Sequence, residues 1–119
     1  MSRERASPRR PKRPPRTPPS LAIFWTDRAL TDLEAIGDYI ARDNPAAAER
    51  WVMKLVAAAE RAATAPRSGR RVPELARDDV REVLLRRYRI VYRPGEHRLE
   101  ILTVFEGHQL FPAEVAEED

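Results

Sequence analysis

Two kinds of hydrophobic spacing divide this chain, and the change between them limits its possible folds more than any other feature. Apolar residues recur every three to four positions over 27–42 and again over 45–64, which predicts two amphipathic helices. In the last third of the chain, short apolar runs predict strands over 80–86, 88–93 and 98–106. Because the helices and most strands are segregated along the chain, the pattern indicates an α+β domain.

The connection between the two predicted helices is short. The first helix stops before Asp43-Asn44-Pro45, where Asn44 can cap the second helix and Pro45 can occupy its first position. So short a link predicts an antiparallel helical hairpin. An apolar strand over 21–26 precedes the hairpin. The predicted order is therefore β-α-α-β-β-β, with the hairpin packed on one face of an antiparallel sheet.

The predicted strands are apolar on both faces, whereas one helical hairpin can cover only one face of a sheet. An exposed apolar patch on a small domain usually marks a partner-binding site. We therefore expect the second face to bind a partner protein through Val83, Leu85, Val91, Leu102 and Val104. The alternative is that the C-terminal segment folds over this face, using Leu110, Phe111 and Val115.

Charge is distributed unevenly along the sequence. Residues 1–20 hold seven basic residues and one acidic residue, whereas residues 21–119 hold 15 basic and 18 acidic residues. The net charge of +3 therefore does not predict nucleic-acid binding by the folded part. Six prolines and no aromatic residue predict disorder for 1–20, which is either a dispensable extension or an electrostatic arm for nucleic acid.

Composition also excludes several kinds of site. The chain has no cysteine, and His97 and His108 are its only histidines, so we expect neither a metal site nor a cofactor. No apolar run approaches the ~20 residues of a membrane span, and the N-terminus lacks the apolar region of a secretory signal. We expect a cytoplasmic protein with one domain over 21–112, preceded by the basic tail and followed by an acidic end at 113–119.

Several stretches, in this order and spacing, resemble the RelE/ParE family of toxins from bacterial type II toxin–antitoxin modules. The family's paired helices are similar to "WTDRALTDLEAIGDYIARDNPAAAERWVMKL", and its following loop to "PRSGRRVPEL". Its three-stranded end resembles "VREVLLRRYRIVYR" and "RLEILTVFEGHQLF". The resemblance implies a growth-inhibiting toxin of the plasmid-stabilisation type. A cognate antitoxin that wraps the toxin would neutralise it, and the apolar patch would be the antitoxin surface.

The family divides by target. RelE-like members cleave mRNA in the ribosome, which requires cations for the phosphate and an acid–base pair. ParE-like members inhibit DNA gyrase and need no catalytic set. The resemblance places Arg89 where RelE-like enzymes hold phosphate, with His108 as the candidate acid–base. The structural alternative for Arg89 is an ion pair with Glu82 or Glu100, and a further alternative is contact with an antitoxin carboxylate. Contacts to the target or to nucleic acid are expected from Arg70, Arg71, Arg86, Arg87 and Arg93.

Two departures from the RelE-like pattern favour the gyrase side. Some RelE-like enzymes carry a lysine pair on the strand before "YR", but here that strand reads "VREVLLR". They also have a basic residue and a tyrosine near the C-terminus, whereas residues 99–119 contain no Arg, Lys or Tyr and six acids. Whether the chain is an enzyme stays open at this point. A third interpretation is a degenerate, non-toxic binding module.

Overall fold

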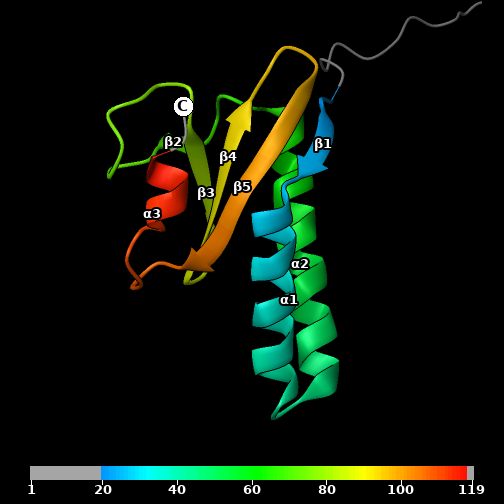
Figure 1. The fold of residues 1–119 in the computed structure, drawn as a ribbon. Coiled ribbons are helices and arrows are strands. Elements are labelled where there is room, and N and C mark those ends of the chain that lie inside the picture. Colours follow the sequence, from blue (N-terminus) through cyan, green and yellow to red (C-terminus); the bar gives the residue numbers. More distant parts are fainter. Residues whose placement is uncertain (1–19, 118–119) are drawn as a thin grey trace, which may run out of the picture.

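The computed structural model describes residues 20–117, which form a helical hairpin against a five-stranded sheet (Figure 1). The helices of the hairpin are α1 and α2, Asp27–Ala41 and Pro45–Thr64. The strand order is β1-β5-β4-β3-β2. The remaining elements are β1 Ala22–Trp25, β2 Arg70–Arg71, β3 Arg81–Leu85, β4 Tyr88–Pro94, β5 Arg98–Glu106 and α3 Ala113–Ala116.

Side-chain caps fix where the two long helices begin. The Thr26 hydroxyl accepts a hydrogen bond from the amide of Ala29 at 3.2 Å and donates one to the carbonyl oxygen of Ile101 at 2.8 Å. Asn44 caps α2 by accepting from the amide of Ala47 at 3.1 Å. The predicted helical hairpin is therefore confirmed, and its first cap also ties α1 to β5.

The fold is α+β, as predicted, but the sheet is mixed. Strands β3, β4 and β5 run antiparallel, whereas β1 pairs in parallel with β5, with Ile23 opposite Leu99. Strand β2 adds the other edge, where Arg70 lies opposite Glu82. The sequence did not predict β2 or α3, because elements of two and four residues are too short to show a periodic pattern.

A β-bulge in β5 changes which residues face the hairpin. Val91 lies opposite Thr103 and Tyr92 lies opposite Ile101, so Leu102 is an extra residue with no direct partner. An extra residue reverses the alternation of side chains beyond it. Val104 consequently packs in the core against the hairpin, and its predicted position on the second face is wrong.

The register between β3 and β4 corrects two further assignments. Val83 lies opposite Ile90 and Leu85 lies opposite Tyr88, and directly opposed residues share a face. Val83 and Leu85 therefore pack against the hairpin core rather than on the second face. The predicted packing of Tyr88, Ile90 and Tyr92 against the helices is confirmed.

The second face of the sheet has its own apolar cluster. Its sheet residues Val91, Leu102 and Phe105 are buried beneath Val115 of α3 and the loop after α2, which contributes Val72, Leu75 and Val80. Figure 1 shows α3 on the opposite side of the sheet from the hairpin. The expectation of an open apolar patch is therefore wrong for the isolated chain, and the alternative of a covering C-terminal segment describes the structure.

The basic tail lies outside the described residues except for Ser20. Among residues 20–117, no helix is long and apolar enough to cross a bilayer. No group of three or more His, Cys, Asp or Glu side chains in that part of the chain is arranged to hold a metal ion.

Candidate functional site

Arg89 lies at the centre of a buried ion-pair network on the second face of the sheet. Its Nε donates to Glu82 at 2.7 Å, and Nη1 and Nη2 donate to the two oxygens of Glu74 at 2.8 and 2.7 Å. Arg70 donates to the other oxygen of Glu82 at 2.5 Å. The Arg89 side chain is 8% exposed and that of Glu82 is 0% exposed. The network therefore fastens the loop after α2 onto β3 and β4.

Aromatic rings enclose the Arg89 guanidinium. Its carbon lies 5.0 Å from the ring centre of Phe105 and 5.8 Å from that of Phe111. These rings meet edge to face with their centres 5.6 Å apart. The hydrogen bonds to Glu74 raise the pKa of Arg89, and the same bonds lower the pKa of Glu74. All three nitrogens of Arg89 are therefore occupied by carboxylates in a partly desolvated setting.

The structural alternative for Arg89 has the partner Glu82 and not Glu100. Glu100 instead accepts from Arg93 Nη2 at 2.7 Å. Glu74 was missed by sequence reasoning, because it lies in an irregular loop where no periodicity places it near β4. The one sequence feature that could have indicated Glu74 as a partner is that it is the single acidic residue in "PRSGRRVPEL".

Acid should destabilise the fold through these ion pairs. Hydrogen bonds from Arg89 and Arg93 lower the pKa values of Glu74 and Glu100 in the folded chain, whereas in the unfolded chain both return to about 4.3. The unfolded chain therefore binds more protons around and below that pH. The stability contribution is complete above about pH 4.3 and is lost as the pH falls through the folded values.

Urea unfolding between pH 7 and pH 3 tests this dependence. Glu100→Gln should flatten the loss of stability below about pH 4.3, because it removes one of the shifted carboxyls. Glu96→Gln, in the exposed β4–β5 turn, is the matched control and should leave the pH profile unchanged. An unchanged profile in Glu100→Gln would contradict the assignment.

A shallow hollow of about 310 Å³ collects most of the predicted cationic residues at the β3–β4 turn and the end of β5. His108 borders it with a side chain that is 71% exposed, and its Nε2 lies 3.9 Å from Glu106. The predicted residues that line this hollow are Arg70, Arg86, Arg87, Arg89 and His108. Arg71 and Arg93 lie elsewhere and pair with Asp78 at 3.0 Å and Glu100 at 2.7 Å.

Arg86 occupies an uncommon backbone conformation at the rim of this hollow. Its φ is 56°, in the left-handed region, at the turn that joins β3 to β4. In this region the backbone conformation of a residue other than glycine costs roughly 1–2 kcal/mol of stability. Within residues 20–117 Arg86 forms no ion pair, so the turn presents an exposed cation despite the strain.

The hollow offers a cationic rim but not an assembled catalytic set. Phosphodiester cleavage requires cations free to hold the phosphate and an acid–base pair near the reacting oxygens. Arg89 turns its nitrogens toward Glu74 and Glu82, and within residues 20–117 the side-chain contact of His108 is the one with Glu106 at 3.9 Å.

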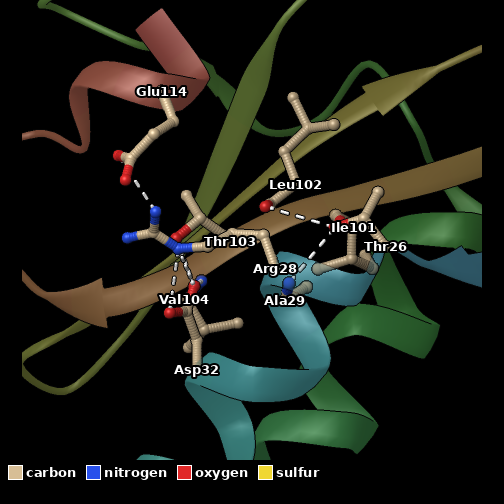
Figure 2. Close-up of polar contacts among 9 residues, drawn as sticks. All are labelled: Thr26, Arg28, Ala29, Asp32, Ile101, Leu102, Thr103, Val104 and Glu114. Carbon is tan, nitrogen blue, oxygen red and sulfur yellow. Dashed lines mark hydrogen bonds and ion pairs between the residues drawn. The ribbon is translucent and has the colours of Figure 1, made fainter.

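A second polar network joins α1, β5 and α3 (Figure 2). Asp32 Oδ2 accepts from the Thr103 hydroxyl at 2.5 Å and from the amide of Val104 at 3.1 Å. Arg28 Nε lies 3.1 Å from Asp32, and its Nη1 lies 3.0 Å from Glu114. Sequence reasoning missed this network, although the spacing of Arg28 and Asp32 by four residues on one helix was a usable signal.

The five apolar residues predicted to contact an antitoxin do not form one surface. Val91 and Leu102 lie in the covered second-face cluster, whereas the other three pack toward the hairpin. A role for them in antitoxin binding stays a prediction. The three hairpin-side residues are Val83, Leu85 and Val104.

A helical hairpin against a small mixed sheet, with a cationic turn at one end, defines a small α+β domain. Comparison of the sequence with models of known protein families identifies the family of this domain. The chain belongs to the ParE toxin family of type II toxin–antitoxin systems (parDE), whose model matches residues 23–111. The resemblance seen in the sequence is thereby confirmed.

Individual relatives agree with this family. The chain is 42% identical over 92 residues to the candidate toxin Y4kP of Sinorhizobium fredii, covering 76% of this chain and 92% of the relative. It is 43% identical over 63 residues to Toxin RelE2 of Caulobacter vibrioides, covering 53% and 67%. Among solved structures, a chain of the chromosomal ParDE system from P. aeruginosa has the same fold, with a TM-score of 0.63 and 24% identity over 73% of this chain and 96% of that chain.

Proposed function

We propose that this chain inhibits bacterial growth by binding DNA gyrase, and that a cognate antitoxin neutralises it. Membership of the ParE toxin family supports the toxin–antitoxin part of this proposal. The observation that favours gyrase over mRNA is the state of Arg89, whose three nitrogens all donate to Glu74 or Glu82. A gyrase inhibitor needs a binding surface and no phosphate-cleaving set, and it acts in the cytoplasm with its target.

Induced expression in bacteria and a gyrase assay test the proposal. Expression without the adjacent small open reading frame should arrest growth, and coexpression with it should restore growth. The purified chain should block supercoiling by gyrase and should leave mRNA intact on translating ribosomes. Arg86→Gln should weaken the block, because it removes an exposed cation, whereas Arg50→Gln on the exposed surface of α2 should not.

One observation supports a ribonuclease as the second candidate. Arg70, Arg86, Arg87, Arg89 and His108 border the same hollow, which is where a phosphate would bind. Codon-specific mRNA cleavage that is lost in His108→Ala would replace gyrase inhibition with this activity. His108→Ala suits the test because the exposed side chain is not needed for folding. Absence of growth arrest would instead leave a non-toxic binding module.

A further inference from the structure

The hydroxyl of Tyr88 has no hydrogen-bond partner among residues 20–117, although the residue is largely buried. Tyr88 begins β4, is only 7% exposed, and packs against Trp51 with the ring centres 5.9 Å apart. Within residues 20–117 its hydroxyl makes no hydrogen bond, whereas the other buried tyrosine, Tyr92, donates to the carbonyl oxygen of Pro66 at 2.7 Å. Buried hydroxyls are nearly always hydrogen-bonded to protein or to water, and Tyr88 borders an open hollow, so its hydroxyl is available to a group from outside the chain.

This side chain borders a hollow of about 380 Å³ between α1 and the C-terminal end of β5. Its apolar lining includes Ile36 and Val104, and its polar lining includes Tyr39, Glu106 and Gln109. The hollow is separate from the Arg89 network, although Tyr88 lies at the border of both hollows. Convergent polar groups above an apolar floor are typical of a site that binds an amphipathic side chain.

The electrostatics of the hollow favour a cation. Arg28 and Asp32 also line it, but they pair with each other, and Arg28 pairs further with Glu114. The remaining charge is Glu106, whose nearest cation, the exposed Arg87, lies at 3.5 Å. Burial raises the pKa of Tyr88, and the negative charge of Glu106 raises it further. The protonated hydroxyl keeps an oxygen lone pair that can accept a hydrogen bond from a cationic ligand.

We infer that this hollow binds an arginine or lysine side chain of a partner protein, with the cation between the Tyr88 hydroxyl and the Glu106 carboxylate. The partner is the antitoxin, so this assignment rests on the proposed function. The apolar stem of the ligand packs against Ile36 and Val104, as arginine and lysine stems commonly do. The exposed Tyr39 ring also lies at the rim, where Arg42 is already 5.8 Å from its centre.

Titration with agmatine, a guanidinium on a four-carbon stem, tests the site without an antitoxin. The probe should shift the tyrosine side-chain resonances of the ¹³C-tyrosine-labelled full chain, with Tyr88 among those that respond. N-acetylcitrulline amide, which is neutral but similar in shape, and inorganic phosphate should bind weakly or not at all. Tyr88→Phe and Glu106→Gln should each weaken agmatine binding about tenfold, which corresponds to one charge-assisted hydrogen bond.

Matched variants keep the result interpretable. Glu96→Gln removes the same charge beside the other end of β5 and should leave agmatine binding unchanged. Unchanged agmatine binding in Glu106→Gln would overturn the site, and so would tighter binding of phosphate or no binding of agmatine to the wild-type chain. Because the Glu106 side chain is partly exposed at the end of β5, the Glu106→Gln outcome is readable even if Tyr88→Phe fails to fold.

A second arm tests the partner. The antitoxin encoded beside this chain should abolish the agmatine-induced shifts when it binds. An antitoxin that binds while agmatine stays in place would overturn the assignment of the hollow to the antitoxin. These outcomes differ from failure of the proposed function, because absence of growth arrest on expression leaves agmatine binding unaffected.

Discussion

Replacing Arg89 with alanine should lower the free energy of unfolding by about 3 kcal/mol, because the buried Glu82 carboxylate loses one of its two cations. The substitution also removes the stacking of the guanidinium against Phe105 and Phe111. Arg70 stays beside Glu82 but is half exposed, which keeps the loss near the low end for a broken buried pair. Urea denaturation at pH 7 measures this change.

A double substitution separates the charge effect from lost packing. Glu82→Gln combined with Arg89→Ala should be more stable than the sum of the two single losses predicts, because no unpaired charge is then buried. Arg93→Ala is the matched control on the same strand. Its pair with Glu100 is partly exposed, so the expected loss is below about 1 kcal/mol. Equal losses in Arg89→Ala and Arg93→Ala would refute the buried-network interpretation.

Asp32→Ala should cost about 2–4 kcal/mol, since it leaves two groups without their acceptor. The Thr103 hydroxyl, which belongs to a fully buried residue, and the amide of Val104 both donate to Asp32. The loss also frees Arg28, through which α1 holds α3 by the pair with Glu114. Thermal or urea unfolding monitored by circular dichroism checks the magnitude.

Two variants control for helix propensity and for charge. Asp32→Asn keeps one side-chain oxygen as an acceptor and should lose less stability than Asp32→Ala. Asp38→Ala removes an exposed carboxylate from the same helix and should change the stability by less than about 0.5 kcal/mol. If Asp32→Ala and Asp38→Ala have the same stability, the Asp32 network does not support the fold.

The parts of the fold that follow from local spacing could be predicted. The start of the second helix after Asn44 was visible because capping residues act within one turn. The bulge at Leu102 was not visible, because it depends on how two strands align rather than on the residues of one strand. Because this extra residue was not predicted, the sequence analysis assigned Val104 to the wrong face of the sheet. The parallel pairing of β1 with β5 was missed for the same reason.

The candidate site was predictable only in part. The sequence indicated Arg89 as a candidate residue and Glu82 as a possible ion-pair partner. Glu82 lies seven residues away on the neighbouring strand of a tight hairpin. Glu74 reaches Arg89 from an irregular loop, and no short-range rule places it there. The orphaned hydroxyl of Tyr88 is also invisible in the sequence, because satisfaction of a buried hydroxyl depends on the surrounding tertiary structure.

The parallel pairing of β1 with β5 has a consequence for synthesis of the chain. Ile23 of β1 lies opposite Leu99 of β5. Strand β1 is therefore synthesised early but cannot pair until β5 has been synthesised. Contacts between residues so distant in the sequence form late, because a long loop must close before they stabilise anything. The nascent chain can form its helical hairpin early, but it cannot close the sheet until β5 has left the ribosome. Translation itself therefore delays the appearance of the complete toxin fold.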